Sequence, residues 1–309
     1  MFTRETIASA NTTIKTIDVK GKPYAPVSEK VKAFRLISPG ACLETEVVAK
    51  NEQGMLIKAT VKDEGGIPIS TGHAYESKGS SQVNTSNALE NSETSAVGRA
   101  LENAGISLRV RTKGSSLAEV NADIKTIEVK GKAYPEVSER IAAFRTLYPA
   151  GRIETAVEDF TGQSVTFVAR VYDGEGALLA TGRASEIKSK DGINALNFVE
   201  NCETSAIGRA LSFAGFGIAV SIASAEEMKY AETLFSPATE EQMAEIKELE
   251  AKQPKKTIDA VWKKYCPSKK DLDSFNADKI IQTYKNCLKL EEEKKNSGET
   301  IMSAVTNYT

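Results

Sequence analysis

The pattern of apolar and polar positions repeats along the first two thirds of the chain at a constant offset of 110 residues. Residues 14–106 align with residues 124–216 without a gap. In the longest match, Glu-Thr-Ser-Ala-Val-Gly-Arg-Ala-Leu at 93–101 faces the same residues, with Ile for Val, at 203–211. Matches spread over the whole aligned range indicate a tandem duplication, whose period is too long for a solenoid repeat. Each copy is long enough to form a small domain or a tightly coupled half-domain.

Within each copy the pattern predicts a strand, a helix, antiparallel strands and a second helix. In copy one, a short strand and turn over residues 14–22 precede a helix with Ser28 as N-cap, and Pro39-Gly40 ends that helix. In copy two, apolar residues alternate from Val165 to Val171, and a hairpin turn at 173–176 leads into a return strand. Antiparallel hairpins with helices outside them define an α+β fold.

The closing helix of each copy is predicted over residues 87–104 and 197–214, with Gly105 and Gly215 as helix C-caps. A glycine inside this helix costs about 1 kcal/mol relative to alanine, so we expect a strand or a neighbouring subunit to approach it closely. After about residue 221 three amphipathic stretches predict a small helical domain. The predicted organisation is an N-terminal tail (1–13), repeat 1 (14–113), a linker (114–122), repeat 2 (123–222), a helical domain (223–295) and a mobile tail (296–309).

Composition narrows the function classes. The net charge of −2 gives no global basic signal, so nucleic-acid binding would require a local patch. No apolar run is long enough to span a membrane, and the first 13 residues do not read as a signal peptide. Four scattered cysteines without metal-ligand spacing favour a cytoplasmic chain with reduced thiols. No GxxxxGK[ST] loop is present, so we expect no ATP and no other cofactor.

Charge separates the two copies. Residues 14–113 carry 14 Lys plus Arg against 11 Asp plus Glu, whereas residues 123–222 carry 11 against 13. The cluster Arg109, Arg111 and Lys113 lies on an alternating stretch that could be a strand with its basic residues on one face. This cluster makes copy one the better candidate for phosphate contact, the alternative being a solvated linker edge.

The repeated arginine of the closing helix, Arg99 or Arg209, has two interpretations. One is a packed helix with one solvated arginine, and the other is a guanidinium placed to meet a phosphate backbone. His73, replaced by Arg183 in copy two, is interpreted as a surface strand residue and not a catalytic base. For three further sets we favour structural roles, namely helix capping for Glu90/Glu93 and Glu200/Glu203 over Mg²⁺ binding, and packing for Tyr24, Tyr134 and Tyr148 over base stacking.

A resemblance adds to this picture. The second copy, with Val137-Ser138-Glu139-Arg140, Phe144-Arg145, Tyr148-Pro149, Glu154-Thr155, Ala180-Thr181-Gly182 and Glu200-Asn201-Cys202-Glu203 before the Gly-Arg-Ala-Leu helix, resembles proteins of bacteriophages and prophages. Through its order of elements it also resembles the RAD fifty-two superfamily of single-strand annealing proteins. That resemblance implies oligomers that hold single-stranded DNA in a basic groove, in a bacterial host cell. It places Arg99 and Arg209 at a DNA-contacting position, and Lys78, Lys188 and Lys190 in a basic segment before the helix.

The copies also depart from one another. Copy one has Ser38 where copy two has Tyr148, and Glu102-Asn103 where copy two has Ser212-Phe213. Either the two copies pack against different surroundings, or only one of them binds.

The leading hypothesis is a homo-oligomer that binds and anneals single-stranded DNA in recombination and repair without ATP, through Arg99, Arg209, Lys78, Lys188, Lys190, Arg109, Arg111 and Lys113. The alternative is a non-catalytic scaffold or inhibitor that binds a protein partner, with the C-terminal helices as a second possible partner site. A metal-dependent nuclease is a distant third, because no aspartate-rich motif accompanies the glutamate pairs.

Overall fold

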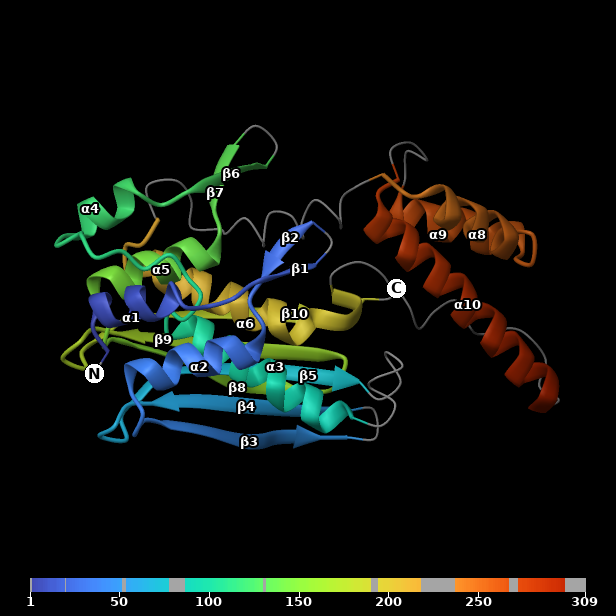
Figure 1. Cartoon of the computed structure of the whole chain (residues 1–309). Coiled ribbons are helices and arrows are strands. Elements are labelled where there is room, and N and C mark those ends of the chain that lie inside the picture. The colour runs from blue at the N-terminus through green and yellow to red at the C-terminus, as the bar shows by residue number, and fades with distance from the viewer. Residues whose placement is uncertain are drawn as a thin grey trace. The chain divides into compact units, whose positions relative to one another are not determined.

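A computed structural model describes residues 2–19, 21–51, 54–77, 87–129, 132–189, 194–217, 237–266 and 272–297. The chain forms two compact units, Met1–Met228 and Lys229–Thr309. The first unit contains both copies of the repeat, and the second contains the C-terminal helices (Figure 1). The chain is thus an α+β protein in which two repeated β-rich units precede a helical region.

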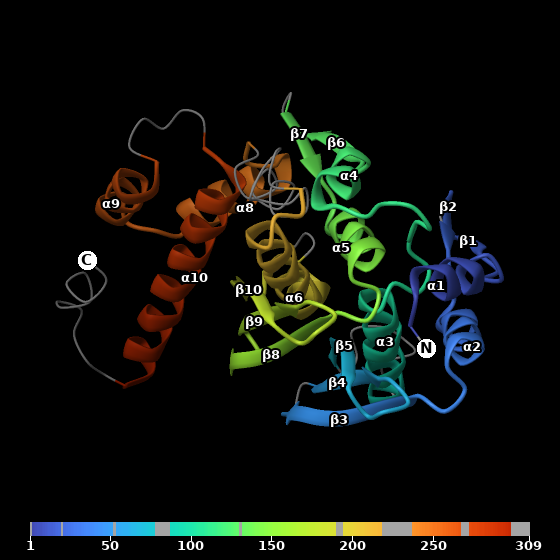
Figure 2. The same ribbon diagram turned by 90° about the vertical axis from the view of Figure 1, so that its left-hand side faces the viewer.

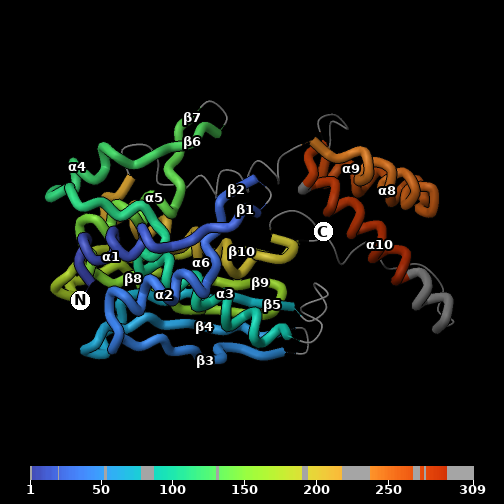
Figure 3. Tube along the Cα trace, viewed as in Figure 1, coloured from blue at the N-terminus to red at the C-terminus, as the bar shows by residue number. Residues whose placement is uncertain are grey.

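Both copies have the same order of elements, which Figure 3 traces along the chain. A short helix and a two-stranded hairpin are followed by a helix, three long strands and a closing helix. Copy one has α1 (Arg4–Asn11), β1 (Ile17–Val19), β2 (Lys22–Tyr24), α2 (Val27–Ile37), β3 (Cys42–Lys50), β4 (Gly54–Lys62), β5 (Pro68–Ser77) and α3 (Ala88–Asn103). Copy two has α4 (Leu117–Ala122), β6 (Thr126–Val129), β7 (Lys132–Pro135), α5 (Val137–Leu147), β8 (Arg152–Phe160), β9 (Ser164–Tyr172), β10 (Leu178–Ile187) and α6 (Asn194–Phe213).

Six strands join into one sheet with the order β10-β9-β8-β5-β4-β3. Each copy contributes an antiparallel meander, as the alternation of its residues predicts. The two meanders meet through β5 and β8, which run parallel and pair at a single position, Ser70 with Ile153. The expectation of antiparallel pairing alone is therefore wrong at the junction, because it treated each copy as a separate sheet.

Helices α3 and α6 pack on the sheet, α3 against β4 and β5 and α6 against β9 and β10 (Figure 2). Close packing depends on a glycine in the third strand of each copy. A Cβ on Gly72 would lie 2.3 Å from the Ala100 nitrogen, and one on Gly182 would lie 2.4 Å from the Ala210 nitrogen. The repeated Thr-Gly pair therefore marks the point where strand and helix backbones touch.

The helix ends confirm some local expectations and correct others. Gly105 and Gly215 have φ values of 93° and 98°, as the predicted C-caps require. Helix α2 begins at Val27 without a side-chain cap, so Ser28 is not its N-cap. The helix glycine Gly98 is approached by the side chain of Val27 in α2, 2.8 Å from an added Cβ, and not by a strand of its own chain. The segment interpreted as a linker contains α4.

The C-terminal unit contains helices α8 (Glu240–Glu250), α9 (Lys255–Tyr265) and α10 (Ser274–Ser297). Thr239 caps α8, with a capping box that includes Gln242. Trp262, Ile280 and Tyr284 are among the buried residues of its core. No helix within the described residues is long and apolar enough to cross a membrane.

Candidate functional site

Arg99 lies on α3 and reaches across the junction to α6 of the second copy. Its Nε donates to Oε2 of Glu203 at 2.8 Å, and its Nη2 donates to the Glu200 carbonyl and the Thr204 hydroxyl, each at 3.0 Å. Glu203 is fully buried and the Arg99 side chain is 23% exposed. The Arg99 guanidinium is therefore engaged within the protein, and its contact with a phosphate remains an untested expectation.

The Glu203 carboxylate is the centre of this cluster. It accepts from the Thr155 hydroxyl at 2.6 Å and lies 2.8 Å from His73 Nδ1. Burial alone would raise the pKa of Glu203, but the charge of Arg99 and the hydrogen bonds from His73 and Thr155 outweigh burial and hold that pKa well below its usual range. Because an ionised carboxylate only accepts, His73 carries its proton on Nδ1.

His73 is 1% exposed, so its interpretation as a surface strand residue is wrong. The helix-capping interpretation of Glu200 and Glu203 is also incomplete, because both carboxylates bond to β5. Glu203 accepts the His73 backbone N–H at 3.1 Å, and Glu200 accepts the Tyr75 backbone N–H at 2.8 Å. Strand β5 pairs with β8 at only one position, and two of its other backbone N–H groups are accepted by the carboxylates of Glu200 and Glu203 on α6. These side chains supply the hydrogen-bond partners that a buried backbone N–H needs.

Glu200 has an unusual environment. Its Oε2 is buried and has no hydrogen-bond partner among the described residues. Burial raises the pKa of Glu200 to about 7, although the charge of Arg99 opposes the rise. The junction therefore contains one carboxylate that is ionised at all ordinary pH values and one that titrates near neutrality.

Arg145 of α5 completes the junction from the other side. It is fully buried, and it donates to the carbonyls of Asn103 at 2.8 Å, Ile69 at 3.0 Å and Gly151 at 2.5 Å. Asn103 in turn donates to the Thr71 carbonyl at 2.7 Å. The counterpart of Asn103 in copy two is Phe213, at the end of α6, and it is 49% exposed. The copies differ here because copy two covers Asn103, whereas no described residue covers Phe213 to a similar extent.

The basic cluster after α3 does not form a strand. Arg109 pairs with Glu139 at 2.8 Å, and Arg111 pairs with Asp123 at 2.5 Å. Both arginines therefore bind the start of copy two, where the carboxylates of Glu139 and Asp123 offset much of their positive charge. Lys113 is exposed.

The remaining predicted basic residues are distributed over other parts of the unit. Arg209 is half-buried on α6 and lies over the ring of Phe213, 5.8 Å from its centre. Lys188 is half-buried just after β10. Lys78 and Lys190 lie outside the described residues. Among the described residues, Arg209 and Lys188 share no contact with Arg109 or Arg111.

The strands of the large sheet also offer little free charge. Four of their six Lys and Arg residues are matched with acids on neighbouring or nearby strand positions, which reduces attraction to a polyanion, whereas Lys50 and Arg170 form no such ion pair with a described residue. The pairs are Lys58 with Glu46 at 2.7 Å, Lys62 with Glu44 at 2.5 Å, Arg152 with Glu154 at 3.4 Å and Arg183 with Glu158 at 2.9 Å.

Two small hairpins carry basic residues that the sequence analysis did not single out. Residues 14–24 and 124–134 each contain three lysines and one acid. Lys15 and Lys22 of the β1–β2 hairpin are exposed, as are Lys125 and Lys132 of the β6–β7 hairpin. Both hairpins project from the helical side of the unit, away from the large sheet (Figure 1). The repeated sequence Val-Lys-Gly-Lys was the available signal.

The same backbone contact positions both hairpins. The N–H of Lys15 donates to Glu29 on α2 at 3.3 Å, and the N–H of Lys125 donates to Glu139 on α5 at 3.1 Å. Each hairpin is thereby held over the first turn of the helix that follows it. Tyr24 remains 46% exposed on the first hairpin, whereas Tyr134 on the second is 7% exposed. Packing thus accounts for Tyr134, and Tyr24 keeps an open face.

Other surfaces are poor candidates for anions or metals. The first turns of α2, α3 and α5 carry Glu29, Glu90 and Glu139, which repel a phosphate from the N–H groups there. Within the described ranges, no group of three or more His, Cys, Asp or Glu could hold a metal ion. Within the first unit, the hairpin lysines are therefore the best candidate site for a polyanionic ligand.

Comparison with known families corrects the expected resemblance. Residues 31–104 and 141–214 each match the family described as Slr1353 N-terminal dsRNA-binding domain-like. The two matches have the same offset as the repeat, and each spans one helix–three strands–helix segment. No curated protein and no solved structure matches the chain.

The expected relation to phage annealing proteins and the RAD fifty-two superfamily is therefore wrong, because a general order of helix, antiparallel strands and helix does not identify one family. The family match supports a nucleic-acid-binding type of domain but not single-strand annealing. Each repeat of this chain is similar, over its helix–three strands–helix core, to the Slr1353 N-terminal dsRNA-binding domain-like family.

Proposed function

We propose that the first unit binds double-stranded RNA without catalysis, through the lysines of its two hairpins. The supporting observation is the occurrence of the same exposed basic hairpin beside each of two domains that match a dsRNA-binding-like family. Lys15, Lys22, Lys125 and Lys132 provide four positive charges that are exposed on these hairpins. The rest of the unit carries 20 Lys plus Arg against 26 Asp plus Glu, so the hairpins supply the local positive patch.

Duplex RNA suits this arrangement for a geometric reason. An A-form duplex is recognised by its shape and by its phosphate and 2′-hydroxyl groups, which repeat regularly along the helix. Two similar hairpins on one rigid unit can contact two successive stretches of one duplex. Lysine acts as a point charge toward phosphate, so the contacts need no particular base sequence.

The sequence led us to expect single-stranded DNA binding and annealing. The family match supports nucleic-acid binding in general, but no comparison supports annealing of single strands. The exposed ring of Tyr24 beside Lys22 gives single strands one possible stacking surface. The test of duplex RNA binding must therefore include single strands and a complementary strand.

The experiment compares labelled duplex RNA, duplex DNA, single-stranded RNA and single-stranded DNA of one sequence by fluorescence anisotropy at several salt concentrations. The full chain is compared with Lys22→Glu/Lys132→Glu. We expect duplex RNA to bind best, and the variant to weaken its binding and reduce the salt slope by about 1 per lysine.

Lys255→Glu/Lys256→Glu is the matched control, because it makes the same charge change at exposed positions of the C-terminal unit. An equal loss in this control would assign the effect to net charge and overturn the hairpin site. Tight binding of single-stranded DNA with faster annealing, and no duplex RNA binding, would overturn the ligand class.

A further inference from the structure

The junction between the repeats joins unlike edges. The third strand of copy one, β5, meets the first strand of copy two, β8. The first strand of copy one, β3, and the third strand of copy two, β10, remain as the edges of the sheet. These two outer edges are the repeat equivalents of the two edges that already meet. A second chain could therefore place its β3 edge against β10 in the way that β8 lies against β5.

The two residues of the ion pair across the junction have identical counterparts beside the outer edges. Arg99 corresponds to Arg209, and Glu203 corresponds to Glu93. At the junction, the Thr155 hydroxyl orients Glu203 by a hydrogen bond of 2.6 Å. On the outer edge, the hydroxyl of Thr45 donates to Glu93, also at 2.6 Å. The exposed Glu93 carboxylate is thus held in the same way as the buried one.

The other acceptors of Arg99 are also repeated. Thr204 donates to the Glu200 carbonyl at 2.8 Å, and both groups accept from Arg99. In copy one, Thr94 donates to the Glu90 carbonyl at 2.8 Å. A guanidinium that arrived at this edge would find a carboxylate, a carbonyl and a hydroxyl in the arrangement that receives Arg99.

Arg35 shows the same relation on the α2 side. Like its counterpart Arg145, it bonds through Nη1 to two carbonyls of its own copy, those of Pro39 at 3.3 Å and Ala41 at 2.5 Å. Arg145 uses Nε and Nη2 for carbonyls across the junction. Arg35 is exposed, and no described residue accepts from its Nε or Nη2. The Nε and Nη2 groups of Arg35 can therefore donate to carbonyls of a second chain, as the same groups of Arg145 donate across the junction.

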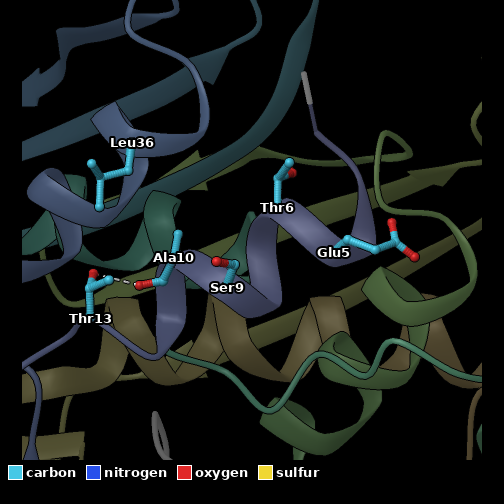
Figure 4. Close-up of a pocket in the computed structure, with 6 residues that line it drawn as sticks. All are labelled: Glu5, Thr6, Ser9, Ala10, Thr13 and Leu36. Atoms are coloured by element: carbon cyan, nitrogen blue, oxygen red, sulfur yellow. Dashed lines mark hydrogen bonds between the residues drawn. The ribbon is translucent and has the colours of Figure 1, made fainter.

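On both outer edges, apolar side chains are exposed at positions whose repeat counterparts are buried in the junction. Leu36 is 66% exposed beside a depression between α1 and α2, lined by Glu5, Thr6, Ser9, Ala10, Thr13 and Leu36 (Figure 4). Its counterpart Thr146 is fully buried and accepts the Arg111 N–H of copy one at 3.1 Å. On the β10 edge, Leu179 is 37% exposed and its counterpart Ile69 is 1% exposed.

We propose that separate chains of this protein associate head to tail. The β10–α6 edge of one chain would lie against the β3–α3 edge of the next chain, and Arg209 of the first would bond to Glu93 of the second. A second copy is the occupant that fits, because each outer edge repeats one half of a junction whose other half is present on the same chain. Arg183, which replaces His73 on β10, is paired with Glu158 on β8 of its own chain, so Arg209 is the cation proposed to meet Glu93 of the next chain. Such an interface is heterologous and can join more than two copies.

The test is sedimentation velocity of the full chain over a range of concentrations, after nuclease treatment so that association does not depend on nucleic acid. We expect wild type to associate, and both Arg209→Glu and Glu93→Arg to shift to monomer because like charges then face one another. An equimolar mixture of the two variants should associate again, since the two reversed charges meet at one interface and the native pair of Arg209 with Glu93 forms at the next. Circular dichroism and thermal unfolding establish that each variant is folded.

The double variant Arg209→Glu/Glu93→Arg should associate with itself and guards against loss of folding in either single variant. Lys255→Glu is the control charge reversal in the C-terminal unit, outside the repeats, and should associate as wild type does. A monomeric wild type at every concentration would overturn the proposal. Single variants that associate normally, or a mixture and double variant that remain monomeric, would overturn the contact between residues 209 and 93.

Discussion

Arg99 Nε lies 2.8 Å from Glu203 Oε2, and this ion pair joins two copies of one sequence across 104 residues of chain. The pair is supported by His73 of β5 and Thr155 of β8. These contacts make the two copies a single compact unit with one sheet. The repeated arginine therefore has a structural role at one of its two positions.

Loss of this ion pair should destabilise the first unit strongly. Arg99→Ala leaves the Glu203 carboxylate buried without its cation, and we expect a loss of about 3–5 kcal/mol. Arg209→Ala is the matched control, because it removes the same side chain from the outer edge, where we expect a loss below about 1 kcal/mol. Urea unfolding followed by circular dichroism measures both. Similar losses at the two positions would contradict the assignment of Arg99 to the junction.

Glu200 should make stability fall as the pH rises toward neutrality. Its pKa is raised by burial to about 7, so between pH 4.5 and 7 the folded chain retains a proton that the unfolded chain releases. This contribution is fully present below pH 4.5 and is lost as the pH rises through 7, and it amounts to about 1–3 kcal/mol. Glu203 affects the pH dependence of stability in the opposite direction. Because its pKa is lowered in the folded chain, its contribution to stability is present above about pH 4.5 and is lost as the pH falls below that value.

Glu200→Gln separates the two carboxylates. The glutamine stays neutral and can still accept the Tyr75 N–H through its carbonyl, so the stability curve of this variant should be flatter than that of wild type from pH 5 to 8. Denaturant unfolding at half-unit pH intervals measures the two curves. An unchanged slope in Glu200→Gln would show that another group titrates in this range.

Sequence patterns predicted the repeat, the order of elements from the first hairpin to the closing helix of each copy, and several helix ends, because these depend on local spacing, but they missed helices α1 and α4. The 110-residue offset fixed the two copies, alternation fixed β9, and Gly105 and Gly215 fixed the ends of α3 and α6. Periodicity does not specify what lies beside an edge strand. The sequence therefore did not reveal that β5 meets β8.

The site residues were harder to predict for the same reason. Arg99 and Arg209 lie in the same local sequence, yet only the first reaches Glu203, because only copy one has a copy after it in the chain. His73 looked like a surface residue because its counterpart is Arg183, but the junction buries it. The basic hairpins could have been found from the sequence, since Lys-Gly-Lys occurs at the turn of both.

The strand glycines should be intolerant of a methyl group. In Gly72→Ala and Gly182→Ala the new Cβ would lie 2.3 Å and 2.4 Å from a helix nitrogen, so helix and strand must separate. We expect each substitution to cost about 1–3 kcal/mol, measured by thermal or urea unfolding. Gly174→Ala is the control, because no atom lies within 4 Å of its added Cβ. Equal stability of all three variants would contradict the close approach.

The two hairpin tyrosines should separate stability from binding. Tyr134 is 7% exposed in a cluster with Val129, so Tyr134→Ala should destabilise the unit by roughly 1–3 kcal/mol. Tyr24 is 46% exposed, so Tyr24→Ala should change stability by less than about 0.5 kcal/mol. Stacking requires an unpaired base, so Tyr24→Ala should weaken single-strand binding while duplex RNA binding stays within about twofold. Anisotropy titrations of both ligands, beside urea unfolding, decide this. A large loss of duplex binding in a stable Tyr24→Ala variant would instead place this ring at the duplex itself.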